Sequence, residues 1–196
     1  MLINAFALLR KSTSARLILI GDGPERDNLK SLIVKHGLET DVSMPGFVSN
    51  PYVYFRRSSI FVLSSIWEGL PTVLIEALAC GTRIISTDCP SGPKEILDDG
   101  RWGILVPVGD IASLAEQMSV LLDQPKPKSI PSSWRKFTVD NSTKAYEDFE
   151  EKLTKIKVNI KNFFIILLAY HLHQNLTAFL STFHILWAEP SMVGIT

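Results

Sequence analysis

Two glutamates, Glu68 and Glu76, flank a Gly-Leu-Pro turn and the start of a predicted helix. The apolar run Ile60–Leu63 before them is typical of a buried parallel strand, so we expect Glu68 at the carboxyl end of that strand. Pro71 suits the first position of a helix, and Gly81 suits the residue just after its end. Open α/β sheets bind ligands at the carboxyl ends of their strands, and the N–H groups at a helix N-terminus favour a phosphate.

The two carboxylates can bind the parts of a ligand that extend from such a phosphate. Glu76 falls one to two turns into the predicted helix, and a carboxylate accepts hydrogen bonds from two adjacent hydroxyl groups. With Glu68 beside the helix start, one site offers contacts for a phosphate, a ribose and a sugar. The spacing therefore predicts a site for a nucleotide sugar.

Strands and helices alternate along most of the chain. The patterns predict strands at Leu17–Ile20, Asp41–Ser43, Ile60–Leu63, Arg83–Ser86 and Gly103–Val106. They predict helices at Leu2–Lys11, Glu25–His36, 50–57, Thr72–Cys80, Pro93–Leu97 and Ile111–Leu122. This alternation predicts an α/β fold with a Rossmann-like, doubly wound parallel sheet and helices on both faces.

The segment that contains the two glutamates resembles the E-x7-E signature of the retaining glycosyltransferases of family 4, also called group 1. Further segments match that family in the same order: Leu17–Pro24, Met44–Val48, Gly81–Leu97 and Gly103–Val106. The resemblance extends from about Leu2 to about Leu153. It implies that the chain is the C-terminal, donor-binding half of a GT-B fold, with a helical extension at its C-terminal end.

The resemblance also implies a role for individual residues. The family's counterpart of Glu68 contacts the donor sugar, which makes Glu68 the candidate catalytic residue, and the counterpart of Glu76 binds the ribose hydroxyls. The other implied donor-binding residues are Gly69, Leu70, Pro71, Thr72 and Val73 near the diphosphate, and Gly46, Phe47 and Val48 near the nucleobase. For this last group, a plain strand-to-helix turn remains an open alternative.

The implied reaction is transfer of a sugar from a nucleotide donor, expected to be a UDP-sugar, to a glycan or lipid-linked acceptor with retention of configuration. Segments such as Asp88–Pro93 resemble enzymes of bacterial surface-polysaccharide assembly. In the family, the acceptor domain and an Arg–Lys pair precede the helix that matches Leu2–Lys11. We therefore expect acceptor binding through a missing N-terminal domain and an inactive isolated chain. The alternative is a truncated, non-catalytic remnant that binds a nucleotide sugar or nothing.

One segment resembles part of a dinucleotide-binding site without completing it. Gly21–Pro24 looks like part of the dinucleotide fingerprint G-x-G-x-x-G, but Arg26 stands at its third glycine, so we predict a structural turn. An oxidoreductase domain is the weaker alternative.

Arg83 replaces the family's usual proline at a strand start and is not expected to substitute for the basic pair. Gly92, in the loop before the helix that contains Glu95, is expected to allow close backbone approach.

Composition and residue spacing indicate which binding partners and which cellular location to expect. The 20 basic and 20 acidic residues cancel, which gives no indication of a nucleic-acid partner. Cys80 and Cys89 form neither a C-x-x-C pair nor a disulfide framework, which favours a cytoplasmic location. His171, His173 and His184 have no nearby carboxylate to complete a metal site. No metal or cofactor is expected apart from the nucleotide-sugar donor.

Three regions are predicted along the chain: a nucleotide-sugar-binding domain at 1–123, a proline linker and helix at 124–155, and an apolar tail at 156–196. The helix is expected from Trp134 to about Leu153, with Phe137, Tyr146, Phe149 and Leu153 as packing candidates. In the tail, the apolar run Phe163–Tyr170 is shorter than the roughly 20 residues that span a membrane. Lysines precede it, which fits peripheral association with a membrane surface. The interpretation that we favour is a C-terminal extension foreign to the domain.

Overall fold

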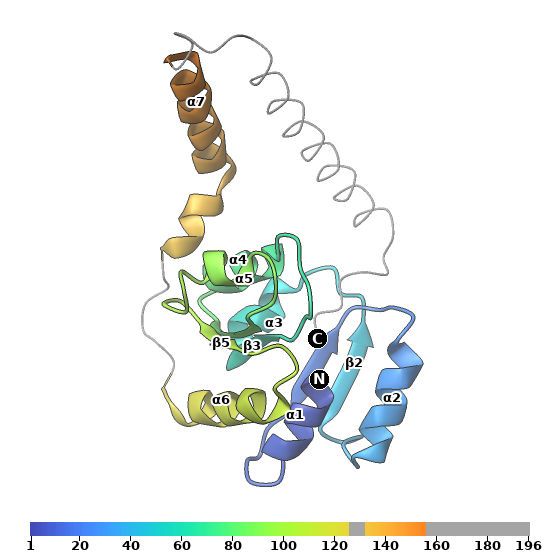
Figure 1. Ribbon diagram of the computed structural model, residues 1–196. Helices are drawn as coiled ribbons and strands as arrows, with labels where there is room; N and C mark the ends of the chain where they lie inside the picture. The colour runs from blue at the N-terminus through green and yellow to red at the C-terminus, as the bar shows by residue number, and fades with distance from the viewer. Residues whose placement is uncertain (126–131, 156–196) are drawn as a thin grey trace. The chain divides into compact units, whose positions relative to one another are not determined.

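The computed structural model describes residues 1–125 and 132–155 (Figure 1). Contacts divide the chain into two compact units, with the boundary between Trp134 and Arg135. In the first unit the strands are β1 (Leu17–Ile20), β2 (Val42–Gly46), β3 (Ile60–Leu63), β4 (Arg83–Thr87) and β5 (Ile104–Val106). Its helices are α1 (Leu2–Leu9), α2 (Arg26–Lys35), α3 (Tyr52–Arg57), α4 (Thr72–Ala79), α5 (Pro93–Ile96) and α6 (Ile111–Asp123). The predicted alternation of strands and helices is confirmed.

All the described strand pairs are parallel, and they form two sheets. β1 pairs with β2, with Leu17 opposite Val42. The second sheet has the order β3-β4-β5, with Ile60 opposite Arg83. The Rossmann-like α/β class is confirmed. The described hydrogen-bond ladder is nevertheless divided between β1 and β3, where the sequence predicted one continuous sheet.

Helices cover both faces of the three-stranded sheet. Figure 1 shows α6 on one side of β3 and β5, and α4 and α5 on the other. α6 packs against β3, β4 and β5, whereas α4 packs against β4. The start of α6 is fixed by Asp110, whose Oδ1 accepts a hydrogen bond of 2.9 Å from the Ser113 N–H. The helices therefore lie on the faces of the sheet, and the loops that follow β3 and β4 lie at the carboxyl ends of these strands.

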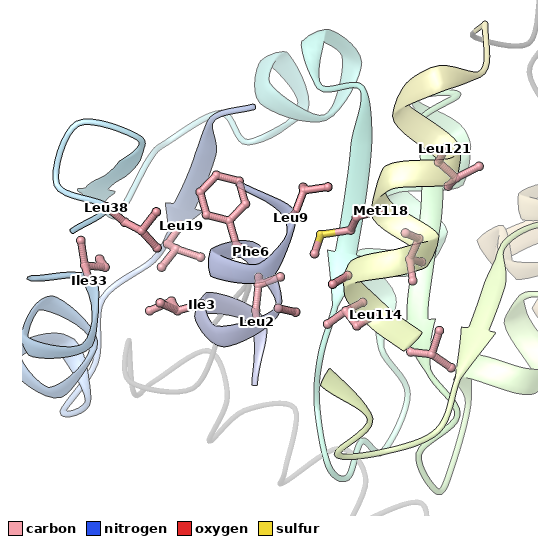
Figure 2. Packing of buried hydrophobic residues seen from close by; sticks show 14 residues of the cluster. Leu2, Ile3, Phe6, Leu9, Leu19, Ile33, Leu38, Leu114, Met118 and Leu121 are labelled. Carbon is pink, nitrogen blue, oxygen red and sulfur yellow. The ribbon is translucent and has the colours of Figure 1, made fainter. Parts of the chain in front are cut away.

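Helix α1 contributes most of its length to the hydrophobic core (Figure 2). The predicted apolar face of Ile3, Phe6 and Leu9 is confirmed, since none of these side chains is more than 4% exposed. They belong to one cluster with side chains from β1, α2, the loop after α2 and α6, namely Leu19, Ile33, Leu38, Leu114 and Met118. Because α1 contacts both α2 and α6, it connects the region around β1 with the region around β3–β5.

Several predicted boundaries differ from the structure. β2 continues through Pro45 to Gly46, which is allowed because β2 lies at the edge of its sheet and Pro45 need not donate to a ladder. The helix predicted from Trp134 begins as a 3-10 turn at Ser133–Phe137. The α-helix itself, α7, runs over Val139–Lys155 in the second unit.

One of the packing candidates is wrong, because the Tyr146 side chain on α7 is 56% exposed. The side chains of Phe149 and Leu153, and the whole predicted tail at 156–196, lie outside the described residues. Within the described ranges, no helix is both long and apolar enough to cross a membrane.

Candidate donor-binding site

The loop between β3 and α4 holds Glu68 in place through its side chain. The Ser65 hydroxyl donates a hydrogen bond of 2.6 Å to Glu68 Oε1. In turn, the Thr87 hydroxyl at the end of β4 donates a bond of 2.5 Å to the Ser65 carbonyl oxygen. Hydrogen bonds to an ionised carboxylate are stronger than those between neutral groups, so the Glu68 side chain has a defined orientation.

The backbone of Glu68 is tied to the loop that follows β4. The Glu68 N–H donates to the Pro90 carbonyl over 3.0 Å, and the Ser91 N–H donates to the Glu68 carbonyl over 3.2 Å. Because β3 and β4 are neighbouring parallel strands, their carboxyl ends bring these two loops together. Glu68 therefore lies at the predicted edge of the sheet, fixed by both of its peptide groups.

Gly92 allows the two loops to pack closely. Its φ angle is +92°, and a Cβ atom built there would lie only 2.5 Å from Pro71 Cδ and 3.3 Å from the Gly69 carbonyl oxygen. Real Cβ atoms do not approach other atoms to 2.5 Å, so no other residue fits without movement of the loop. The predicted close backbone approach at Gly92 is confirmed.

Helix α4 begins at Thr72, where the predicted range Thr72–Cys80 also begins. Its first helical residue is Thr72, and Pro71 occupies the capping position with a non-helical ψ of 81°. The prediction that Pro71 is the first helical residue is therefore wrong. The Thr72 N–H donates to the Leu70 carbonyl over 2.8 Å, in a tight turn that brings the chain into the helix.

Glu76 lies in the second half of α4, and its side chain is half-buried. Burial raises the pKa of Glu76 because a carboxylate loses favourable hydration. Burial also raises the pKa of the neighbouring Cys80 thiol, and the charge of Glu76 adds to that rise while Arg56 opposes it. A carboxylate in such surroundings is stabilised when a ligand's hydroxyl groups donate to it.

The predicted nucleobase-binding residues lie at the end of β2 and in the loop just after it. Gly46 ends this strand with a φ of +81°, the Phe47 side chain is 81% exposed, and Val48 is partly exposed. No hydrogen bond or ion pair described by the structure joins these residues to Glu68 or Glu76. The structure thus brings together Glu68, Gly69 and Pro71 with the loop around Gly92, and leaves Gly46, Phe47 and Val48 on a separate loop.

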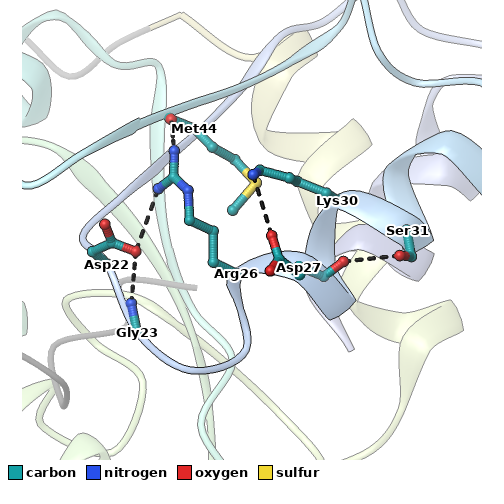
Figure 3. Close-up of polar contacts among 7 residues, drawn as sticks. All are labelled: Asp22, Gly23, Arg26, Asp27, Lys30, Ser31 and Met44. Atoms are coloured by element: carbon teal, nitrogen blue, oxygen red, sulfur yellow. Dashed lines mark hydrogen bonds and ion pairs between the residues drawn. The ribbon is translucent and has the colours of Figure 1, made fainter.

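The turn at Gly21–Pro24 is fixed by an ion pair (Figure 3). Asp22 Oδ1 accepts from the Gly23 N–H over 2.9 Å and lies 3.5 Å from Arg26 Nη1. Arg26 Nη2 donates to the Met44 carbonyl over 3.0 Å, which connects the turn to β2. Arg26, at the position of the third glycine of a dinucleotide fingerprint, therefore has a structural role, as the sequence predicted for this turn.

Two parts of the site were not anticipated from the sequence. Ser65 and Glu68 have the S-x-x-E spacing of a capping box, but their bond joins two side chains and no helix begins at Ser65, so this spacing did not predict it. The bonds from Glu68 to Pro90 and Ser91 had no signal in the sequence, because they join backbone groups that only the fold brings together.

Arg83 lies at the start of β4, far along the strand from the Glu68 loop. Its Nη1 donates to the carbonyl oxygens of Leu121 and Gln124, the latter over 2.7 Å, and its Nε donates to the Ser59 carbonyl over 3.1 Å. These bonds close the C-terminal end of α6. The guanidinium is thus occupied at the opposite end of the strand from the candidate site, in agreement with the expectation for Arg83.

The chemistry that the described residues offer is hydrogen bonding and electrostatics. In the ranges 1–125 and 132–155, no three His, Cys, Asp or Glu side chains are grouped as a metal site would require. Cys80 and Cys89 are both free thiols. The three tail histidines considered above lie outside these ranges.

Comparison with known proteins identifies the family. Residues 1–136 match the family model described as glycosyl transferases group 1. The chain belongs to this family. The group 1 match includes every residue of the candidate site, from Gly46 to Glu76, and confirms the resemblance seen in the sequence.

Two group 1 relatives come from Campylobacter jejuni. The first is N-acetylgalactosamine-N,N'-diacetylbacillosaminyl-diphospho-undecaprenol 4-alpha-N-acetylgalactosaminyltransferase, 36% identical over 64% of this chain and 34% of its own length. The second is GalNAc-alpha-(1->4)-GalNAc-alpha-(1->3)-diNAcBac-PP-undecaprenol alpha-1,4-N-acetyl-D-galactosaminyltransferase, 30% identical over 83% of this chain and 45% of its own length. The chain thus spans less than half the length of either relative.

Solved structures confirm the fold. The lipopolysaccharide outer core galactosyltransferase WaaB superposes with a TM-score of 0.65 at 25% identity, over 74% of this chain and 43% of WaaB. Anabaena HepE, solved in complex with UDP, gives a TM-score of 0.64 at 23% identity, over 79% of this chain and 45% of HepE. The chain therefore has the Rossmann-like architecture found in GT-B glycosyltransferases.

Proposed function

We propose that this chain is the donor-binding half of a retaining glycosyltransferase that uses a UDP-sugar. The observation that carries the proposal is the unit formed by β3, its loop and α4. In this unit Glu68 is held at the carboxyl end of the strand by Ser65 and Pro90, and Glu76 lies half-buried on the helix that follows. Glu68 precedes the N-terminus of α4 and Glu76 follows it. The two carboxylates therefore suit the sugar and the ribose of a nucleotide sugar, with the diphosphate at the helix start between them.

Each part of the donor has a proposed partner. The diphosphate lies at the start of α4 near Thr72 and Val73, where the helix dipole favours negative charge. The ribose hydroxyls donate to Glu76, whose pKa is raised by burial. The sugar hydroxyls donate to Glu68. When the glycosidic bond breaks, the same helix N-terminus stabilises the charge on the departing nucleoside diphosphate.

The remainder of the donor site is formed by neighbouring loop residues. We propose that the backbone of Gly69, Leu70 and Pro71 shapes the pocket around the sugar and diphosphate. The backbone of Gly46, Phe47 and Val48 contacts the nucleobase, and the exposed Phe47 side chain offers a ring for stacking.

The relatives support the proposed donor and acceptor. HepE has been solved with UDP and also with UDP and glucose, and the two Campylobacter relatives are named for sugars linked to undecaprenol through a diphosphate. We propose a glycan or lipid-linked acceptor in the assembly of a bacterial surface polysaccharide, at the cytoplasmic face of a membrane. The acceptor is bound through an N-terminal domain outside this chain.

Calorimetric titration of the full chain with UDP, a UDP-sugar and NAD⁺ tests the proposed donor. We expect binding of both uridine nucleotides and none of NAD⁺. Binding of NAD⁺ in preference to UDP would instead favour an oxidoreductase domain, and the absence of any nucleotide binding would contradict the proposal. Binding of a UDP-sugar without transfer, in an assay with labelled sugar and lipid-linked acceptors, would favour the non-catalytic alternative.

A further inference from the structure

The pairing of β1 with β2 is irregular just before the segment 46–48, which is called the nucleobase segment from here on. Ile18 lies opposite Ser43. Two residues further along β1, Ile20 lies opposite Gly46, which is three residues further along β2. This stretch of β2 therefore contains one extra residue, as in a β-bulge, and a bulge bends the strand that carries it. The bend comes directly before the backbone that we propose to contact the nucleobase.

The guanidinium of Arg26 donates to the backbone inside this bulge. Its Nη2 donates over 3.0 Å to the carbonyl oxygen of Met44 (Figure 3). Its Nη1 lies 3.5 Å from Asp22 Oδ1, which also accepts from the Gly23 N–H over 2.9 Å. A guanidinium presents several donors in a fixed planar arrangement. One side chain therefore connects the turn after β1 with the bulge of β2.

The same two side chains pack against Gly46, the first residue of the nucleobase segment. A Cβ atom built at Gly46 would lie 3.7 Å from Arg26 Nη1 and 3.9 Å from Asp22 Oδ2, which is ordinary van der Waals contact. In addition, the Gly21 N–H donates to the Gly46 carbonyl over 2.9 Å. The start of the nucleobase segment is thus fixed both by the turn after β1 and by the ion pair of Asp22 with Arg26.

Stabilisation of α2 does not explain the charge of Arg26. Arg26 is the first residue of that helix, and the helix dipole disfavours a positive charge at a helix N-terminus. The partners of its guanidinium, Asp22 and Met44, both lie outside α2. The charge therefore acts at the junction of β1 and β2, next to the nucleobase segment.

We propose that Arg26, oriented by Asp22, is a positioning residue for recognition of the nucleobase. It fixes the bulge of β2, so that the peptide groups of the nucleobase segment are oriented before the nucleotide binds. Hydrogen bonds to the edge of a base depend on direction, and a site oriented beforehand loses less conformational freedom on binding. Arg26 does not touch the nucleotide, so its loss lowers the preference for one base over another. The inference rests on the proposed donor-binding function.

Calorimetric titration of the full chain with UDP and with ADP tests the proposal, because these two probes differ only in their base. Arg26→Met keeps an unbranched side chain but removes every donor, and Asp22→Asn removes the charge beside Arg26 while keeping an acceptor for Gly23. Lys30→Met is the matched control, since it removes an exposed ion pair with Asp27 from the same helix. We expect Arg26→Met to lower the preference for UDP over ADP by about two- to tenfold. Asp22→Asn should lower it less, and Lys30→Met should leave it unchanged.

Hydrogen exchange of the unliganded chain shows whether Arg26 acts through the bulge. The Gly21 N–H reports on its bond to Gly46, and the Leu17 N–H, which donates to the Asp41 carbonyl near the other end of the β1–β2 ladder, is the internal reference. We expect exchange at Gly21 to be at least about threefold faster in Arg26→Met, with exchange at Leu17 unchanged.

The outcomes separate this inference from the proposed function. If the original chain prefers UDP and Arg26→Met has the same preference, the inference is overturned and the proposed function stands. Faster exchange at Gly21 with an unchanged base preference would also overturn it, because Arg26 would then have a purely structural role. An original chain that binds UDP and ADP equally, or binds neither, would contradict the proposed UDP-sugar donor and this inference together. If Arg26→Met does not fold, the same criteria apply to Asp22→Asn.

Discussion

Replacement of Gly92 by alanine tests whether the two loops of the candidate site depend on each other. Gly92 has a φ of +92°, and its missing Cβ would lie 2.5 Å from Pro71 Cδ and 3.3 Å from the Gly69 carbonyl oxygen. Alanine therefore brings both backbone strain and a steric clash. Since Pro71 is itself buried, the clash is relieved by moving either the loop that contains Gly92 or the chain between Glu68 and α4.

The expected destabilisation follows from these two terms. A non-glycine residue held at an unfavourable positive φ costs about 1–3 kcal/mol, and overpacking by one methyl group commonly costs about 1–3 kcal/mol more. Gly92→Ala should therefore lower the free energy of unfolding by roughly 2–6 kcal/mol. Because the total stability of a domain is about 5–15 kcal/mol, the variant should still fold.

Gly109→Ala is the matched control, since Gly109 has a φ of +84° but no atom within 4 Å of the added Cβ. Urea unfolding gives the stability of both variants, and calorimetry gives their affinity for a UDP-sugar. We expect Gly92→Ala to lose more stability than Gly109→Ala and to be the one that also loses affinity. Equal stability losses and unchanged binding in both variants would refute the reasoning.

Three further substitutions separate binding from stability. Ser65→Ala removes the 2.6 Å bond to Glu68 and should weaken a UDP-sugar by about 1 kcal/mol while leaving UDP unchanged in calorimetry; an equal loss for UDP would contradict this. Arg83→Ala should lower the free energy of unfolding by about 1–3 kcal/mol in urea, because α6 loses its C-terminal donors, without affecting UDP binding. Burial raises the pKa of Glu76, so the folded chain binds more protons than the unfolded chain and its stability falls as the pH rises through that raised value. Glu76→Gln should therefore have a higher Tm than the original chain at pH 7, with the difference shrinking as the pH falls toward 4.5; a constant difference would contradict this.

Much of the fold was predictable because local patterns agree with the tertiary structure. The face of α1 formed by Ile3, Phe6 and Leu9 follows helical spacing, and all three residues are buried. The run Ile60–Leu63 is a parallel strand as predicted, and Gly92 allows the close approach expected of it. In each case a single stretch of sequence carries the signal.

The parts that could not be predicted depend on segments far apart in the chain. Nothing local shows that the ladder is interrupted between β1 and β3, since each strand has an ordinary apolar pattern. The bonds between Glu68 and the loop at Pro90 and Ser91 join backbone groups, which any residue provides. Pro71 fits both the capping position and the first helical position, because its fixed φ suits either, so the sequence alone did not show that Pro71 caps α4.

The central claim is that Glu76 binds the nucleotide and Glu68 binds the sugar of one donor. Calorimetric titration of Glu76→Ala, Glu68→Ala and the control Glu116→Ala, an exposed position on α6, with UDP and with a UDP-sugar tests it most directly. We predict that Glu76→Ala weakens both ligands by about 1–3 kcal/mol, that Glu68→Ala weakens the UDP-sugar more than UDP, and that Glu116→Ala weakens neither. Equal losses for the two ligands in Glu68→Ala, or unchanged UDP affinity in Glu76→Ala, would contradict the account.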